Sequence, residues 1–341
     1  MPKVPERRVV KDRWTSPCGR IELIHGDCLE VLPTIEAGSA DCVVTDPPYG
    51  LKFMGKKWDH GIPGVPTWEA VLATLADSSY LLTFGGTRTY HRLACAVEDA
   101  GFEIRDCLNW LYGSGFPKGK GCLKPAWEPI LLARKPGKVK PLGIDECRVG
   151  TSKGRWPANV VHDGSDEVME GFPETTSGSG ARGGFNFRGG PRSDRDTVFD
   201  GDSGSAARFF YCAKASRAER NAGLEGMPEV ACGMMEDDAY PIKTGSGNLR
   251  NTKRTNHHPT VKPLALLQWL VKLACPPGAV CLDPFIGSGS TALACLRTGR
   301  RCIGIEIDKG YFEIAKRRVM AELLGDGTYE APEHQAEAID F

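Results

Sequence analysis

Four consecutive residues, Asp46-Pro47-Pro48-Tyr49, have the composition of a clamp for a flat amine. They directly follow the apolar run 42–45, and the two prolines fix the backbone so that the flanking polar atoms keep one geometry. An Asp46 oxygen and the Pro47 carbonyl oxygen can accept both hydrogens of an amino group, which polarises its nitrogen toward an electrophile. Tyr49 offers a face on which a planar ring can stack. Taken alone, the tetrapeptide suits a stiff turn capped by an aspartate equally well.

A second group of chemically suitable residues lies near the C-terminus, where VCLDPFIGSGST (280–291) puts an aspartate and two glycines between an apolar strand and a helix. Glycines at such a junction let the backbone pass close to a ligand. About twenty residues further on, Glu306 ends another apolar strand, from which a carboxylate can bind both hydroxyls of a ribose. The candidate cofactor-binding residues here are Asp283, Pro284, Phe285, Gly287, Gly289, Ser290, Glu306 and Asp308.

The residues around these glycines discriminate among nucleotide-containing ligands. A phosphate-binding loop would need Gly-Lys-Ser/Thr, whereas Ser290 follows Gly289 directly. A dinucleotide motif would carry a third glycine where Ala292 stands, although alanine is sometimes tolerated there. The carboxylate of Asp283 opposes a pyrophosphate and favours a cationic ligand. A sulfonium cofactor with an amino group therefore fits better than a nucleotide phosphate.

Together the two segments resemble a known enzyme family. Asp46-Pro47-Pro48-Tyr49 is similar to the D/N/S-P-P-Y/F motif of the amino-methyltransferases that modify DNA, and DPFIGSGST is similar to their cofactor motif. The catalytic motif precedes the cofactor motif here, an order that resembles the β group of the family, and the likeness extends from Ile21 to about Leu324. The resemblance implies S-adenosylmethionine as cofactor, double-stranded DNA as substrate and a homodimer.

Three further segments match the family less specifically. His258-Pro259-Thr260-Val261-Lys262-Pro263 is similar to the segment that closes over the methionine end of the cofactor, which implies that Thr260, Lys262 and Pro263 bind there. Gly26-Asp27-Cys28 resembles the segment beside the adenine ring, although Asp27 suits a helix cap equally well. LNWLYGSGFPKG (108–119) resembles the loop beside the target base. The resemblance implies that three residues of that loop contact DNA: Asn109, Trp110 and Phe116. Either aromatic residue would suit a core position equally well.

The elements that must position these residues alternate between strands and helices, which is typical of an α/β fold. Strands are expected at 21–27, 41–49, 80–86, 107–112, 125–135, 279–285 and 301–308, and helices at 28–38, 67–78, 88–100, 263–274, 288–299 and 310–324. With the resemblance, this predicts a Rossmann-like mixed sheet of seven strands, circularly permuted so that the catalytic half comes first and the cofactor half last.

The stretch 136–255 interrupts this pattern, because glycine, serine, arginine and aspartate dominate it. We expect five regions: a basic arm (1–20), a catalytic half (21–135), an irregular target-recognition insertion (136–255), a cofactor half (256–324) and an acidic tail (325–341). Arginine forks can bind phosphates and guanine edges. The insertion's candidate DNA-binding arginines are Arg155, Arg182, Arg188, Arg192, Arg195 and Arg208. For 182–195 a solvated loop without DNA contacts remains an alternative.

The bulk composition narrows the class of protein. The chain has 341 residues with 43 basic and 43 acidic side chains, so its net charge gives no sign of a polyanionic partner. Its 13 cysteines include no Cys-x-x-Cys pair, which favours free thiols and no metal site. No stretch is long and apolar enough to cross a bilayer or to serve as a secretion signal. We expect a cytoplasmic protein.

The choice of target depends on the first residue of the clamp. Aspartate at position 46, rather than serine, resembles the adenine-modifying members, so adenine N6 is the predicted target and cytosine N4 the alternative. Cytosine carbon-5 chemistry would need a Pro-Cys nucleophile after the cofactor motif, and the one Pro-Cys pair is Pro17-Cys18. Methyltransferases for RNA or protein glutamine usually have the reverse motif order. A catalytically idle DNA-binding regulator on the same scaffold is the rival from another class.

Overall fold

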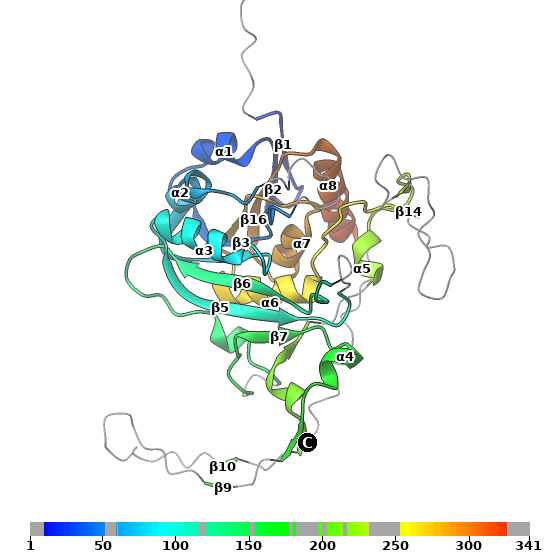
Figure 1. Cartoon of the computed structure of the whole chain (residues 1–341). Coiled ribbons are helices and arrows are strands. Elements are labelled where there is room, and N and C mark those ends of the chain that lie inside the picture. The colour runs from blue at the N-terminus through cyan, green and yellow to red at the C-terminus, as the bar shows by residue number, and fades with distance from the viewer. Residues whose placement is uncertain are drawn as a thin grey trace, which may run out of the picture.

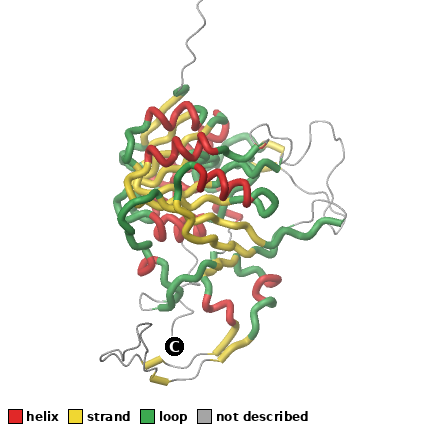
Figure 2. The backbone as a smooth tube through the Cα atoms, turned by 60° about the vertical axis from the view of Figure 1, so that its left-hand side comes forward, coloured by secondary structure: helices red, strands yellow, loops and turns green. Residues whose placement is uncertain are grey.

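The structure is a computed structural model that describes residues 10–51, 59, 61–115, 121–150, 154–176, 180–181, 198–199, 203–213, 217–231 and 253–325. Its centre is one large sheet with helices on both faces (Figures 1 and 2). Strands and helices alternate along residues 12–134 and 264–324, which build most of this sheet and the helices that cover it. This alternation confirms the predicted α/β class.

Ten strands of the described residues form the sheet. In spatial order they are β1 (Asp12–Thr15), β2 (Ile21–His25), β16 (Arg301–Glu306), β15 (Val280–Asp283), β3 (Ala40–Thr45), β4 (Leu75–Phe84), β6 (Trp127–Arg134), β5 (Glu103–Leu111), β7 (Val160–His162) and β12 (Tyr211–Cys212). β2, β16, β15, β3 and β4 run parallel, and β6 is antiparallel to both β4 and β5. The seven strands from β2 to β5 are the predicted mixed sheet, and β1, β7 and β12 extend its edges.

The order of the strands explains how a permuted chain makes one sheet. β15 and β16, from the C-terminal half, lie between β2 and β3, from the N-terminal half. Cys281 of β15 is in register with Cys42 of β3, and Glu306 of β16 with His25 of β2. Because these strands are parallel, their carboxyl ends share one edge, where a ligand cleft is expected.

Each face of the sheet has its own apolar core, since successive residues of a strand point to opposite faces. Val43, Leu81 and Leu282 pack against the helices on one face, and Val44, Leu82 and Cys281 against those on the other. The first set of helices is α1 (Cys28–Val31), the 3₁₀ turn η1 (Leu32–Thr34), α2 (Val65–Thr74) and α3 (Tyr90–Asp99); the second is α6 (Leu264–Ala274), α7 (Ser290–Arg297) and α8 (Lys309–Leu324). Burial on both faces explains why the strands read as continuous apolar runs.

Five of the six predicted helices are shorter than expected, and two of these lie before β4 in the sequence. The helix predicted at 28–38 becomes α1 and η1, because Pro33 has no N–H for a helical hydrogen bond. The helix predicted at 67–78 ends at Thr74, and β4 begins at once with Leu75. Both differences leave the order of elements unchanged.

The segment 136–255 contributes more regular structure than its composition suggests. Its described residues supply β7 and β12 to the main sheet, where β7 runs parallel to β5 and to β12. They also form η4 (Ile144–Glu146), α4 (Asp166–Met169), η5 (Ala206–Phe209), α5 (Arg217–Asn221) and the strand pairs β8 (Glu174–Thr176) with β11 (Ser203–Ser205), β9 (Gly180–Ala181) with β10 (Val198–Phe199), and β13 (Val230–Ala231) with β14 (Lys253–Arg254). β7 and α4 lie below β5 in Figure 1.

Candidate active site

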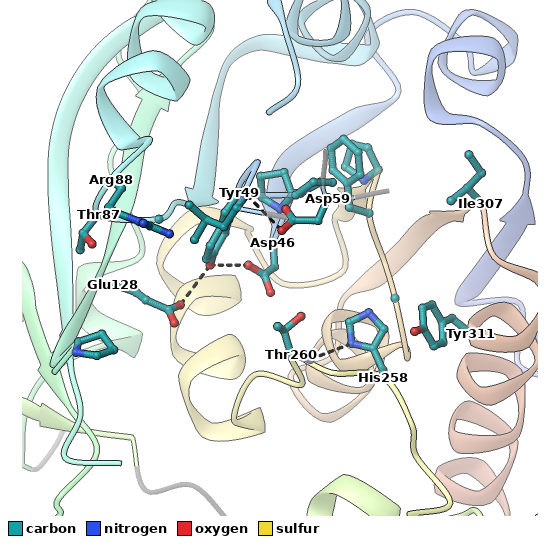
Figure 3. A pocket seen from close by; sticks show the side chains of 18 of the residues that line it. Asp46, Tyr49, Asp59, Thr87, Arg88, Glu128, His258, Thr260, Ile307 and Tyr311 are labelled. Atoms are coloured by element: carbon teal, nitrogen blue, oxygen red, sulfur yellow. Dashed lines mark hydrogen bonds between the residues drawn. The ribbon is translucent and has the colours of Figure 1, made fainter. Parts of the chain in front are cut away.

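A cavity of about 1170 Å³ opens at the carboxyl ends of the parallel strands. Residues of both sequence motifs line it: Asp46, Pro47, Pro48 and Tyr49 from the N-terminal half, and Pro284, Phe285, Gly287 and Glu306 from the C-terminal half. Figure 3 shows Asp46 and Tyr49 on one side of the cavity and His258, Tyr311 and Ile307 on the other. The sheet therefore brings the predicted amine clamp and the predicted cofactor segment to one space.

The clamp is held in place by its neighbours. The Tyr49 hydroxyl donates a hydrogen bond of 2.7 Å to Asp46 Oδ1, and Thr89 Oγ1 donates one of 2.8 Å to the Tyr49 carbonyl. Gly86 packs against the Tyr49 ring so closely that a Cβ there would lie 3.2 Å from Tyr49 Cδ2. Among the described residues nothing donates to the Pro47 carbonyl oxygen, which leaves it available to an amine.

Lys262 lies under the clamp. Its Nζ is 2.9 Å from Asp46 Oδ2 and 3.0 Å from Glu128 Oε2, and it donates a hydrogen bond of 3.1 Å to the Tyr49 hydroxyl oxygen. The ammonium group also lies 4.8 Å from the centre of the Phe84 ring. Lys262 is not on the cavity wall in this structure, and its implied contact with the cofactor's carboxylate stays a prediction.

The protonation of the clamp follows from burial and from these charges. Burial raises the pKa of Asp46 above its ordinary value; Lys262 opposes this and Glu128 adds to it. Burial, with both carboxylates nearby, raises the pKa of Tyr49 well above its usual range, so the phenol keeps its proton. Burial opposes the charge of Lys262, but Asp46 and Glu128 outweigh burial and raise its pKa, so the lysine stays cationic.

The cofactor segment is anchored from below by Asp283, the last residue of β15. Asp283 is 2 % exposed, and its Oδ1 accepts hydrogen bonds from Thr45 Oγ1 (2.6 Å) and from the Phe285 amide (3.0 Å). Burial raises its pKa to about 7. The side chain therefore ties the turn to β3 from within the protein and is not on the cavity wall.

Gly287 and Glu306 lie together on the cavity wall, and the binding of a ribose by Glu306 stays a prediction. The Gly287 amide donates to Glu306 Oε2 (2.9 Å) and the Asp308 amide to Glu306 Oε1 (2.8 Å), which fixes the carboxylate at the cavity. Burial raises the pKa of Glu306 to about 7. Gly287 has a φ of +53°, and a Cβ there would lie 2.8 Å from His258 Nε2, so only glycine fits.

The segment before α6 closes the opposite side of the cavity through His258 and Thr260. The His258 ring packs edge-on against Tyr311, with centroids 4.6 Å apart, and its Nδ1 accepts a hydrogen bond of 3.4 Å from the Thr260 amide. Burial and the nearby cations Arg220 and Lys262 lower the pKa of His258 to about 3, so the ring is neutral. Thr260 itself lines the cavity, as its predicted role requires.

The remaining predicted cofactor residues divide between the cavity and the scaffold. Asp27 and Cys28 line the cavity. The Asp27 side chain caps α1 by accepting from the Leu29 amide, and its contact with an adenine ring stays a prediction. Pro263, Gly289 and Asp308 precede α6, α7 and α8 as helix caps, and the Ser290 hydroxyl accepts a hydrogen bond from Arg318. These last four are not on the cavity wall.

The predicted DNA contacts fall on different parts of the chain. Asn109 and Trp110 lie in β5, where Trp110 is buried against Tyr112, with ring centroids 5.1 Å apart. The guanidinium carbons of Arg155 and Arg208 lie 4.8 and 4.3 Å from the centre of the Phe209 ring. Arg208 also donates a hydrogen bond to Thr175 Oγ1. Five candidates lie outside the described residues: Phe116, Arg182, Arg188, Arg192 and Arg195. All these contacts stay predictions.

Sequence reasoning missed Glu128, Tyr311 and the cavity rim at 122–127. Glu128 lies in the expected strand 125–135, where a lone acid in an apolar run (AWEPILLA) was the available signal. No group of three or more histidine, cysteine, aspartate or glutamate side chains suited to a metal occurs in the described ranges. Within the same ranges, no helix has the length and apolarity to cross a bilayer.

Parts of the sequence are similar to known methyltransferases and methylases. The chain is 40% identical over 96 residues to the type II methyltransferase M2.DpnII of Streptococcus pneumoniae, and 49% identical over 65 residues to the putative methylase YubD of Escherichia coli K12. These matches cover 28% and 19% of this chain, and 35% and 29% of the relatives. The chain thus spans about a third of the length of the curated relatives that it matches.

A solved structure and a family profile extend the likeness over most of the chain. The fold resembles that of PvuII DNA methyltransferase, which is cytosine-N4-specific, with a TM-score of 0.55 and 15% identity over 96% of this chain and 94% of that one. At this identity the likeness concerns the fold alone. The profile of the DNA methylase family matches residues 40–317. These include the clamp, the segment 258–263 and the glycine turn, which is the part of 280–291 that follows Asp283. The chain therefore belongs to the N6/N4 DNA methylase family.

Proposed function

We propose that this protein transfers a methyl group from S-adenosylmethionine to N6 of an adenine that is flipped out of double-stranded DNA. The observation that carries the proposal is the single cavity lined by both the Asp46-Tyr49 clamp and the Gly287-Glu306 wall. Methyl transfer from a sulfonium depends mainly on placing the nucleophile in line with the methyl group, so one shared cavity is what the reaction needs. S-adenosylmethionine is the methyl donor of the N6/N4 family.

The residues on the cavity wall fit this cofactor. Glu306 presents a carboxylate held by two backbone amides, as expected for the hydroxyls of a ribose. Because a Cβ at Gly287 would clash with His258, the bare backbone forms the adjoining wall. The wall also carries Asp27, whose carboxylate favours a cationic sulfonium. When bound, the cofactor supplies an electrophilic methyl group.

The clamp accounts for the nucleophile. Asp46 and the Pro47 carbonyl oxygen accept the two hydrogens of the amino group, which orients the nitrogen lone pair toward the methyl group. Tyr49 stacks on the flipped base. A buried base amine is desolvated there, and its hydrogens need acceptors. A homodimer, in line with the family resemblance, stays a prediction.

The two acceptors of the clamp suit the amine of either base. Adenine is proposed over cytosine because the first residue of the clamp is an aspartate, Asp46, which resembles the adenine-modifying members of the family. The test is to incubate the protein with S-adenosylmethionine and unmodified genomic DNA, then to map modified bases by long-read sequencing. We expect N6-methyladenine at one sequence. Finding N4-methylcytosine instead would establish cytosine as the target. Finding no modified base would contradict the proposal and favour the alternative of a catalytically idle DNA-binding regulator.

The test variant is Asp46→Ala, and its matched control is Asp99→Ala. Asp99 lies at the exposed end of α3, away from the cavity, so its variant should methylate as the unaltered protein does. Asp46→Ala should lose methylation and retain cofactor binding, because Asp46 contacts the amine and not the cofactor segment. Normal turnover of Asp46→Ala would contradict the assignment of the clamp.

A further inference from the structure

A single buried lysine lies between two carboxylates directly under the clamp. Lys262 Nζ is 2.9 Å from Asp46 Oδ2 and 3.0 Å from Glu128 Oε2, and the lysine side chain is only 8% exposed. Asp46 belongs to the clamp after β3, Glu128 to β6, and Lys262 to the segment before α6. Three elements distant in the chain therefore build one charge cluster.

We propose that Glu128 is a positioning residue for methyl transfer: by sharing Lys262 with Asp46, it leaves the Asp46 carboxylate basic enough to take the proton that the methylated amine loses. The inference rests on the proposed function and adds to it a residue that touches Asp46 only through Lys262 and Tyr49. A paired buried lysine and aspartate would form a closed, neutral unit, whereas one lysine for two carboxylates leaves a net negative charge beside the amine.

The charges around Asp46 agree with this assignment. A cation nearby favours the ionised carboxylate and weakens its basicity, and a second carboxylate does the opposite. Burial raises the pKa of Asp46, Lys262 lowers it, and Glu128 raises it, with a net rise. The other titratable or charged groups on the cavity wall are Asp27, Cys28, Asp59, Arg88, Tyr112, Cys122, Lys124, His258, Glu306 and Tyr311.

Tyr49 gives the cluster a second link between the two carboxylates. Its hydroxyl has one hydrogen and two acceptors within reach, Asp46 Oδ1 at 2.7 Å and Glu128 Oε2 at 3.1 Å (Figure 3). While Asp46 is ionised, the hydroxyl donates to the nearer oxygen. When Asp46 gains a proton, the hydroxyl can donate to Glu128 instead by rotating about its C–O bond. Glu128 thus keeps this buried hydroxyl satisfied in both protonation states of Asp46.

The proton balance of the reaction is complete with these groups. A bond forms between the amine nitrogen and the methyl carbon, and the carbon–sulfur bond breaks with its electron pair on sulfur. The nitrogen then loses a proton: the N–H bond breaks, its electron pair stays on nitrogen, and the hydrogen binds an Asp46 oxygen. Asp46 returns this proton to solvent after the product leaves. Lys262 and Glu128 end with the charges with which they began.

The experiment uses Glu128→Gln in the full-length protein. Glutamine keeps the shape and can still accept hydrogen bonds from Tyr49 and Lys262, so the substitution mainly removes the charge. One readout is the pKa of Asp46 in the free protein, from nuclear magnetic resonance of carboxyl-labelled aspartate, with Asp46→Asn assigning the signal. The other is the single-turnover methylation rate at saturating cofactor and DNA from about pH 5 to about pH 9.

We expect the pKa of Asp46 to fall in Glu128→Gln, because a negative charge beside it is lost. The acidic limb of the rate profile reports Asp46 deprotonation and should move to lower pH by about one unit. The maximal rate should fall about tenfold, since a weaker base takes the proton less readily. Cofactor affinity should stay unchanged. Glu98→Gln, at an exposed position of α3, should alter none of these values.

Two further variants make the test independent of the folding of Glu128→Gln. Lys262→Met removes the cation, so the Asp46 pKa should rise, the reverse of the first shift. Glu128→Asp keeps the charge and should keep the acidic limb in place. An unchanged Asp46 pKa in both Glu128→Gln and Lys262→Met would overturn the inference. The titration of Asp46 needs no methylation, so the two proposals fail in different ways. If the unaltered protein methylates DNA and the variants show no shift of the Asp46 pKa, this inference alone is refuted. If the unaltered protein does not methylate DNA, the proposed function is refuted.

Discussion

Thr45 Oγ1 donates a hydrogen bond of 2.6 Å to Asp283 Oδ1 inside the sheet, and both side chains are almost fully buried. Thr45 directly precedes the clamp residue Asp46, and Asp283 directly precedes the glycine turn. One hydrogen bond between β3 and β15 thus links the catalytic and the cofactor segments. In a permuted chain these segments are 238 residues apart, so the sheet alone sets their distance.

Removing the Thr45 hydroxyl should weaken this link. Thr45→Val keeps the shape and leaves Asp283 without one of its hydrogen-bond donors, which should lower the free energy of unfolding by about 1–3 kcal/mol. Urea denaturation measures the change. Thr34→Val is the matched control, because its hydroxyl bonds to the Val31 carbonyl at an exposed position and should cost less than about 0.5 kcal/mol. Equal losses in the two variants would contradict the importance of the Thr45 contact.

Asp283 should make stability depend on pH. Its pKa is raised by burial to about 7 in the folded protein, above the ordinary value of 3.8, so the folded state binds the proton more tightly than the unfolded state. Its contribution to stability is therefore complete below about pH 4 and is lost as the pH rises through about 7. The free energy of unfolding, measured across this range, should fall less steeply with pH in Asp283→Asn. Identical slopes would show that Asp283 titrates normally.

A side chain at Gly287 should disrupt the cofactor wall. Gly287→Ala places a Cβ 2.8 Å from His258 Nε2, in addition to the strain of a left-handed φ. We expect cofactor affinity to fall at least tenfold, equivalent to about 1.4 kcal/mol, as measured by titration calorimetry. Gly299→Ala carries the same type of strain, at a φ of +72°, with open space around its Cβ. The control should lose some stability and keep its cofactor affinity; a similar loss of affinity in both would point to strain alone.

The ring and the hydroxyl of Tyr49 should have separable effects. Tyr49→Phe keeps the stacking face, so DNA binding should change little, whereas Tyr49→Ala should lose about 1–3 kcal/mol of stacking with the flipped base. A fluorescent base analogue at the mapped target position reports flipping directly. Flipping in Tyr49→Ala that matches the unaltered protein would show that another side chain holds the base.

The sequence was sufficient to predict the α/β class, most strands and helices, and the two motifs. Buried parallel strands are continuous apolar runs, and prolines or glycines between a strand and a helix constrain the backbone locally, so these signals need no knowledge of contacts. Asp46, Tyr49, Gly287 and Glu306 were found in this way, and all four line the cavity.

The tertiary structure decided the roles that depend on neighbours from distant segments. Asp283 was predicted to face the cofactor, and pairing of β15 with β3 places it against Thr45 in the interior instead. Glu128 gave only a weak signal, because its significance comes from Lys262, which lies 134 positions later in the sequence. The spacing of residues along one strand or turn is fixed by local geometry, whereas the charge that faces a buried carboxylate is set by which strands pair.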